Sequence, residues 1–287
     1  MSPTVPLGVQ RALRRTSRAV GKATAGARMT PGFLIVGAQR CGTTSMYKAI
    51  TQHPAVLPAV LHKGAHYFDT GYHCGEAWYR GHFPLEASAK RVRRATGATP
   101  LTGESSPYYS FHPLAGERIA RDLPDARLIM LVRDPVERAY SAHAHESARG
   151  FEDQPFERAL ELEDERLAGA EERLRDAPMS RDFDHQHHAY VTRGHYVDQL
   201  ERLTSLVGRD RLHLVDSDEF FTRPEEVYAG VLDFLGLPAW RPESFERHNA
   251  RPRASMPAGL RSRLEDHFAP YDARLAEWWG RTPAWRR

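Results

Sequence analysis

The chain has 287 residues, of which 41% are hydrophobic and 10% aromatic, enough to bury the core of one large α/β domain or two small ones. No apolar run approaches the roughly 18 residues of a transmembrane helix, and the first thirty residues lack the hydrophobic core of a signal peptide. Two cysteines, Cys41 and Cys74, are too few for a disulfide framework, so we expect a cytoplasmic protein.

The net charge of +3 is unevenly distributed along the chain. Residues 1–30 carry +6 and no acidic residue, so the remaining chain carries −3. That excludes the basic excess typical of a nucleic-acid-binding body. We interpret residues 1–30 as a basic, mobile tail. Val9, Leu13 and Val20 share one helical face of it, so weak contact with a membrane surface is the alternative.

The first half of the chain predicts alternating strands and helices. The apolar run Phe33–Val36 indicates a strand, and the following helix ends before Pro54. The extended stretch "AVLPAVLH" and the short helix "WYRGHFP" come next. The segment "TPLTGESSPYY" indicates a second strand that ends in a polar turn at Gly103–Pro107.

The second half continues the alternation. Leu128–Val132 is an apolar strand of the kind buried on both faces of a parallel sheet. Phe156–Arg175 predicts one solvated, highly charged helix. A helix in "YVDQLERLTSLVG", a strand in "RLHLVDSDEF" and a helix closed by Gly236 follow, before a last helix. This order predicts a P-loop-like α/β fold: a doubly wound, mainly parallel sheet flanked by helices, in a single domain at residues 31–287.

The loop after the first strand, "GAQRCGTTSMY", has the composition of an anion site. Gly37 and Gly42 permit a tight turn, and the following helix N-terminus presents amides and a favourable dipole. A nucleotide triphosphatase loop would have lysine at Thr43, which argues against the end of ATP as the anion. The predicted ligands are the Arg40 guanidinium together with the amides and hydroxyls of Cys41, Gly42, Thr43, Thr44 and Ser45.

A second anion site is predicted in "LVRDPVERAYSAH". Arg133 follows a buried strand at the sheet edge where α/β proteins bind ligands, and Ser141 lies about two helical turns later. A Walker B strand would end in a magnesium-binding aspartate where Arg133 stands. We interpret Asp134 and Pro135 as the cap and first residue of the next helix.

Together these segments resemble sulfotransferases that use 3′-phosphoadenosine 5′-phosphosulfate (PAPS). "GAQRCGTTSMY" is similar to their 5′-phosphosulfate loop, and "RDPVERAYSAH" to their 3′-phosphate motif, with Arg133 and Ser141 as the phosphate-binding pair. Four further segments resemble the heparan-sulfate-type branch in place and order: "KGAHYFD…WYRGHFP", "GESSPYYSFHP", "RGHYVDQLERL" and "EFFTRPEEVYAGVLDFLGLP". The resemblance covers roughly residues 31–275.

The resemblance implies in-line transfer of the sulfuryl group from PAPS to a hydroxyl, or less commonly an amine, of a glycan or other small molecule. Arg40 stands where the family usually has lysine, and we expect it to stabilise developing charge. Gly64 replaces the glutamate that is the presumed base of that branch. His66 is our first candidate for the base and Glu104 the second, while a structural role for His66 is equally open. Lys63 matches a family position near the sulfuryl group.

Two further features carry weaker expectations. Arg251 and Arg253 occupy the place of a basic loop that closes over PAPS in the family, and Arg193 precedes a helix on the nucleotide or substrate side. His185, His187 and His188 do not have metal-site spacing, so we interpret them as part of a polar loop and expect no metal.

Two other functions remain open from the sequence. One is a P-loop kinase or nucleotide hydrolase, and the other is a non-catalytic relative that binds the desulfated product, PAP. Gly64 favours the second of these. The pattern does not define the acceptor or the oligomeric state.

Overall fold

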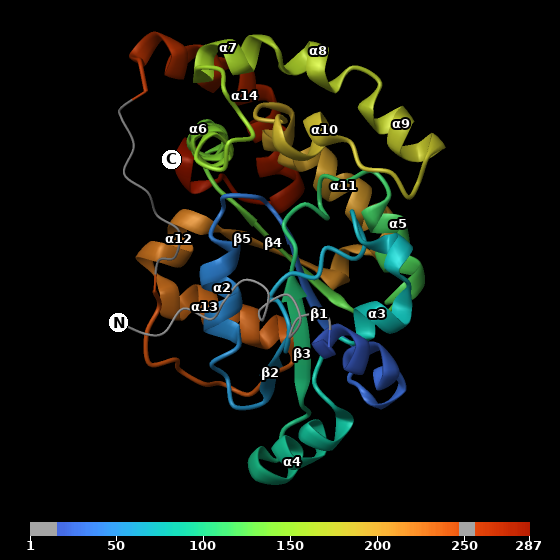
Figure 1. Ribbon diagram of the computed structural model, residues 1–287. Coiled ribbons are helices and arrows are strands. Elements are labelled where there is room, and N and C mark those ends of the chain that lie inside the picture. Colours follow the sequence, from blue (N-terminus) through green and yellow to red (C-terminus); the bar gives the residue numbers. More distant parts are fainter. Residues whose placement is uncertain (1–15, 247–255) are drawn as a thin grey trace, which may run out of the picture.

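The computed structural model describes residues 16–246 and 256–287 (Figure 1). Its centre is one sheet of five parallel strands in the order β2-β3-β1-β4-β5, which confirms the predicted doubly wound α/β fold. The central strands β1 and β4 are buried along their whole length except at Arg127, as expected for strands covered on both faces. The strands are β1 (Phe33–Gly37), β2 (Val56–Pro58), β3 (Leu101–Ser105), β4 (Arg127–Val132) and β5 (Leu212–Asp216).

Helices cover both faces of the sheet. On one face α2 (Thr43–Ile50) packs against α13 (Pro224–Leu235), and on the other α5 (Ala115–Asp122) packs against α11 (Tyr196–Val207) (Figure 1). The helix α13 ends at Gly236, whose left-handed backbone (φ 66°) closes it as the sequence predicts.

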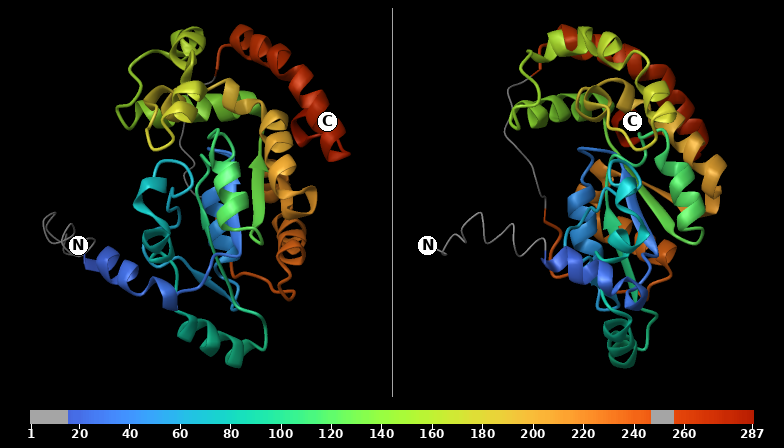
Figure 2. Two further views of the ribbon diagram at one scale, coloured as in Figure 1. Left: turned by 90° about the vertical axis from the view of Figure 1, so that its right-hand side faces the viewer. Right: turned by 45° about the vertical axis from the view of Figure 1, so that its right-hand side comes forward.

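A further layer of helices lies above the carboxyl ends of the strands (Figure 2). Its first member, α6 (Pro135–Ser147), follows β4 directly. The carboxylate of Asp134 accepts the amide of Val136 at 2.9 Å, so the predicted cap is confirmed. The other helices of this layer are α7 (Phe156–Glu161), α8 (Glu163–Leu167), α9 (Ala170–Asp176), α10 (Phe183–His187) and α14 (Ala258–Trp279).

Shorter elements complete the described chain. They are the helices α3 (Glu76–Arg80), α4 (Glu86–Thr96) and α12 (Ser217–Thr222) and the 3-10 turns η1 (Ala25–Ala27), η2 (Tyr72–Cys74), η3 (Thr192–Gly194), η4 (Arg209–Arg211) and η5 (Ala284–Arg286).

The prediction of one solvated helix over Phe156–Arg175 was wrong. The segment forms α7, α8 and α9, which are separated at Leu162 and at Gly169, where the backbone is left-handed (φ 66°). The carboxylate of Glu163 is buried and accepts the backbone amides of residues 190, 191 and 192 at 2.8, 2.7 and 2.8 Å. A charged residue therefore fixes a distant loop here, which the local charge pattern cannot show.

Three other elements differ from expectation. The strand β5 ends at Asp216, whose carboxylate accepts the amides of Asp218 and Glu219 and begins α12. The strand β3 continues through Ser105 instead of turning at Gly103. The helix α4 was not predicted, because its sequence has few apolar residues and buries only Ala89.

The amino-terminal segment is described from residue 16 onward. Residues 16–23 are helical, Arg28 donates a hydrogen bond to the Phe83 carbonyl at 2.5 Å, and the amide of Met29 donates to the Pro84 carbonyl at 2.8 Å. Residues 1–15 of the predicted tail lie outside the described residues. Within the described part of the chain, no helix is both long and apolar enough to span a bilayer.

Candidate active site

The loop between β1 and α2 turns tightly just before the N-terminus of α2. Arg40 and Gly42 both have left-handed backbones, with φ of 71° and 84°. A Cβ atom at Gly42 would lie 3.1 Å from the ring of Phe221 and 3.3 Å from Oγ of Ser217, so the site favours glycine in space as well as in conformation. The turn ends at the N-terminus of α2, where amides without a helical partner and the dipole favour an anion.

Cys41 has a different part in this loop from its neighbours. Its amide donates to the carbonyl of Ala38 at 3.2 Å, and its thiol is buried 3.6 Å from the hydroxyl of Tyr196. Burial raises the pKa of this thiol to about 11, so it is protonated near neutral pH. The anion-binding amides at the start of α2 therefore follow Cys41 in the chain.

The two predicted anion motifs meet directly. Nε of Arg40 donates a hydrogen bond to Oγ of Ser141 on α6 at 3.0 Å. Arg133 stands at the carboxyl end of β4, where its carbonyl accepts the Tyr196 hydroxyl at 3.0 Å and its guanidinium lies 3.6 Å from the Glu137 carboxylate. Two segments about a hundred residues apart thus place cationic and hydroxyl groups at one edge of the sheet.

A histidine–carboxylate pair lies next to this edge. Ser106 connects the sheet to this pair. Its amide donates to the carbonyl of Ile35 on β1 at 3.1 Å, and its Oγ accepts the amide of His66 at 3.0 Å. Nδ1 of His66 lies 2.8 Å from the carboxylate of Asp69. The other ring nitrogen, Nε2, does not take part in this contact, and the His66 side chain is 44% exposed. Asp69 itself is completely buried.

Opposing effects set the pKa values of this pair. For His66, desolvation by burial is the largest effect and lowers the pKa, but the charge and hydrogen bond of Asp69 outweigh it and the net pKa is raised. For Asp69, burial would raise the pKa, while the charge of His66 and the amide of Thr70 bring it below its ordinary value. The imidazole is therefore a stronger base than a free histidine.

Glu104 lies beneath this pair and not at the surface. It is fully buried at the end of β3, and it accepts the amide of Ala65 at 2.6 Å, the hydroxyl of Ser106 at 2.6 Å and that of Tyr109 at 2.8 Å. Burial raises the pKa of its carboxyl group, and the hydrogen bonds oppose that shift. Its geometry is that of a group that holds the Lys63–Asp69 loop in place.

Comparisons with known proteins identify the chain. The profile of the sulfotransferase domain matches residues 30–252. The protein belongs to the sulfotransferase family. A heparan sulfate glucosamine 3-O-sulfotransferase 6 of Homo sapiens is 26% identical over 276 residues, covering 91% of this chain and 75% of that protein. The crystal structure of a sulfotransferase from Alicyclobacillus acidocaldarius superposes with a TM-score of 0.64 at 28% identity, covering 90% of this chain and 100% of that one.

A longer relative matches in part. The bifunctional heparan sulfate N-deacetylase/N-sulfotransferase 2 of Bos taurus is 29% identical over 212 residues. The match covers 72% of this chain but only 22% of that protein, so our sulfotransferase spans about a fifth of its relative's length. These findings confirm the family that the two anion motifs indicate.

The sulfotransferase has no room for a side chain at Gly64, where the heparan-sulfate-type branch resembled by the sequence has glutamate. A Cβ atom there would lie 2.4 Å from the carbonyl oxygen of Ser105 and 3.1 Å from Oγ of Ser106. The close approach is fixed by the amide of Ser105, which donates to the carbonyl of Lys63 at 2.6 Å. Desolvation lowers the pKa of the Lys63 amine, and the charge of Glu104 opposes that shift.

Sequence reasoning missed Gln39 and Glu146, which connect the loop between β1 and α2 to the helices behind it. The side-chain amide of Gln39 accepts a short hydrogen bond from the buried guanidinium of Arg193 and donates to the buried carboxylate of Glu146 at 3.1 Å. Glu146 in turn lies 3.0 Å from Nδ1 of His187. In the sequence, a glutamine next to an arginine does not by itself indicate a structural role. Only the fold brings α6, α10 and η3 to the loop.

The three clustered histidines do not lie in a loop, as the sequence predicted, but pack at α10. Nδ1 of His185 lies 2.6 Å from the Tyr108 hydroxyl, and burial followed by the charge of Arg193 lowers its pKa to about 2. His188 lies between Asp184 and the carbonyl of Phe151, at 2.6 and 2.8 Å. Among residues 16–246 and 256–287, no group of three or more His, Cys, Asp or Glu side chains could hold a metal ion.

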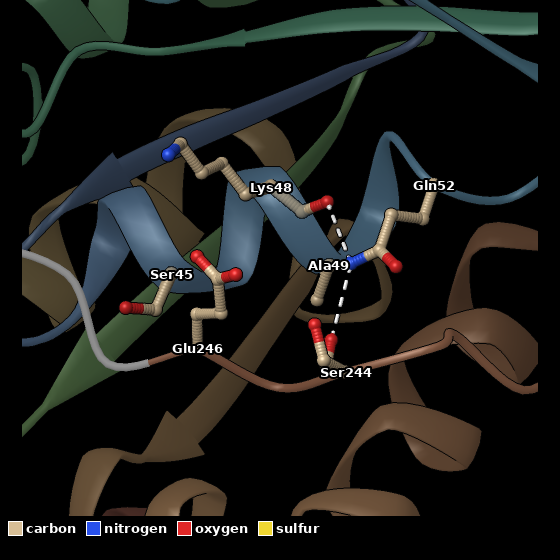
Figure 3. A pocket seen from close by; sticks show the side chains of 6 residues that line it. All are labelled: Ser45, Lys48, Ala49, Gln52, Ser244 and Glu246. Atoms are coloured by element: carbon tan, nitrogen blue, oxygen red, sulfur yellow. Dashed lines mark hydrogen bonds between the residues drawn. The ribbon is translucent and has the colours of Figure 1, made fainter.

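A pocket of about 330 Å³ lies beside α2 (Figure 3). Ser45, Lys48, Ala49 and Gln52 line it from the helix, and Ser244 and Glu246 line it from the segment opposite. Nε2 of Gln52 donates to the carbonyl of Ser244 at 3.2 Å and joins the two sides of the pocket. The predicted ligands Arg251 and Arg253 follow this segment and lie outside the described residues.

Proposed function

We propose that this sulfotransferase moves the sulfuryl group of PAPS to a hydroxyl of a carbohydrate-containing or other small-molecule acceptor, less commonly to an amine. The hydrogen bond from Arg40 to Ser141 carries the proposal, because it joins the loop for one anion to the motif for another. PAPS has two separate anionic groups, which a nucleoside triphosphate does not. The glycan class is supported by the heparan sulfate sulfotransferases among the relatives.

The residues fit such a nucleotide. The amides at the start of α2 and the hydroxyls of Thr43 and Ser45 would hold the 5′-phosphosulfate, while Arg133 and Ser141 would hold the 3′-phosphate. Ser45 also lines the pocket beside α2, so a nucleotide anchored at the helix N-terminus can extend into that pocket. PAPS would supply an activated sulfuryl group and a phosphate leaving group, and no metal is part of the proposal.

The chain's own groups would then serve the transfer as follows. Nε2 of His66 accepts the proton of the acceptor hydroxyl while the acceptor oxygen bonds to sulfur and the bond from sulfur to the 5′-phosphate oxygen breaks. Asp69 orients the imidazole through Nδ1 and stabilises its protonated form. Arg40 stays charged throughout and stabilises the negative charge that develops on the departing oxygen.

The localisation is also a proposal. Cys41 and Cys74 are both free thiols, which suits the reducing cytoplasm predicted from the sequence.

Calorimetric titration tests the nucleotide. We expect PAP to bind and ATP with Mg²⁺ not to bind, and Arg133→Ala to weaken PAP binding at least tenfold, or about 1.4 kcal/mol. Arg127→Ala is the matched control, because Arg127 begins the same strand β4 at its opposite end. Tight binding of ATP with Mg²⁺ in place of PAP would show a kinase or hydrolase, and PAP binding without transfer to any acceptor would show a non-catalytic relative.

A further inference from the structure

Two segments of the sequence carry an excess of positive charge. Residues 1–30 contribute +6 and α4 contributes +3 to a total of +3, which leaves −6 on the rest of the chain. The described part of the first segment and α4 both lie at the lower end of the molecule, away from the α6–α10 layer (Figures 1 and 2). We call the exposed residues of helix 16–23 and of α4 the basic end.

Backbone contacts hold the two parts of the basic end together. Arg28 pairs with Leu85 in an antiparallel bridge, and the amide of Met29 donates to the carbonyl of Pro84 at 2.8 Å. Gly21 and Gly81 approach so closely that a Cβ atom at Gly21 would lie 2.8 Å from the Gly81 carbonyl oxygen. The helix at 16–23 is therefore fixed to the segment from which α4 begins.

The cations of the basic end are exposed and are not neutralised within the described part of the chain. None of them has an ion pair there: Arg18, Lys22, Lys90, Arg91, Arg93 and Arg94. On α4, Lys90 and Arg94 are four residues apart and Arg91 and Arg94 three, spacings at which like charges repel. The helix buries only Ala89. Packing does not account for this arrangement, whereas an anionic partner would.

Apolar side chains beside these cations indicate the kind of partner. Val20 is 53% exposed and Leu85 39% exposed, and both belong to the segments that the backbone contacts join. Residues 16–30 and α4 contain no aromatic side chain that could stack on a nucleic-acid base. Cations around exposed aliphatic side chains match the headgroup region of an anionic bilayer, where both kinds of group gain free energy.

We propose that the basic end is a docking surface for anionic lipid bilayers. The helix α4 precedes the amino end of β3, whereas Arg133 and the phosphosulfate loop lie at the carboxyl ends of the strands. A bilayer bound at α4 therefore leaves the candidate active site open on the opposite side, toward acceptors in solution.

Vesicle cosedimentation of the full chain tests the proposal. We expect binding to phosphatidylcholine vesicles that contain phosphatidylglycerol, no binding to phosphatidylcholine alone, and release by salt. Changing Lys90, Arg91, Arg93 and Arg94 to Gln should weaken binding on the order of several hundredfold, because each of the four cations near such a surface contributes about fivefold. Circular dichroism and PAP titration of this variant should match the unmodified protein, which separates the surface from the nucleotide site.

The matched control removes four exposed arginines elsewhere: Arg158, Arg175, Arg263 and Arg274, each changed to Gln. It changes the net charge equally and should keep vesicle binding. Absence of binding to anionic vesicles at low salt, or equal losses in the two variants, would overturn the proposal. So would tighter binding to duplex DNA than to the anionic vesicles, since that result would assign the surface to nucleic acid.

Discussion

The nucleotide half of the site and the base half are built in different ways. In the proposed function, the nucleotide half is the loop Gly37–Gly42 with α6, and the base half is the loop Lys63–Asp69 with Glu104. The first is formed by two contiguous motifs, each directly after a buried strand, and joined by Arg40 and Ser141. The second depends on hydrogen bonds that the amides of Ala65 and His66 donate to Glu104 and Ser106, about forty residues further along the chain. Contiguous motifs can be recognised in a single sequence, whereas groups that the fold brings together from distant segments cannot.

The difference predicts that the halves fail separately, and His66 should show the largest effect. His66→Gln should lower the turnover number for sulfation of an acceptor roughly a hundredfold or more, because a general base is lost. PAP affinity should stay unchanged, since the nucleotide half is intact. Product formation from labelled PAPS and calorimetry with PAP measure the two quantities. The control is His73→Gln, at an exposed histidine in the turn η2. Equal loss of binding and turnover would contradict the separation.

Gly64 tests whether the base half could be returned to the pattern of the heparan-sulfate-type branch. Gly64→Glu should not raise activity but should lower the free energy of unfolding by about 2 kcal/mol, because its Cβ atom would collide with the Ser105 carbonyl. Thermal unfolding should show a melting temperature lower by roughly 5 °C. The matched change Gly230→Glu lies in α13, where a Cβ atom meets nothing within 4 Å, and should leave stability equal or slightly higher. A more active and equally stable Gly64→Glu enzyme would disprove this.

Gln39 connects the nucleotide half to the helices above it. Gln39→Glu should weaken PAP binding about tenfold, because its carboxylate would face that of Glu146. Adding Glu146→Gln should restore part of the loss, since one carboxylate and one amide again face each other. Calorimetry on the two single variants and the double variant gives the coupling. If the double variant loses as much PAP binding free energy as the two single variants together, Gln39 does not position the loop through Glu146.

The sequence predicted the part of the molecule whose physics is local. The strands β1 and β4, the cap at Asp134 and the two motifs that indicate the family all follow from neighbouring residues. The burial of Glu104 and Glu163 cannot be predicted in this way, because a glutamate is expected at the surface unless its distant amide partners are known. The three helices at residues 156–176 were misjudged for the same reason. Gly64 was noticed as a departure, but its cause is a backbone contact that only the structure shows.

Asp69 should give the smallest and most specific effect. His66 must be neutral to accept a proton, so turnover should rise with pH through a His66 pKa that Asp69 holds above its ordinary value. Asp69→Asn removes that negative charge, lowers the pKa and moves the rising limb of the pH–rate profile to lower pH. At pH values below the original rising limb, the variant therefore keeps a larger fraction of its own maximal activity. That maximal activity is a few-fold lower than in the unmodified protein, because the imidazole is a weaker and less oriented base. A limb that stays in place, or moves to higher pH, would show that another group accepts the proton.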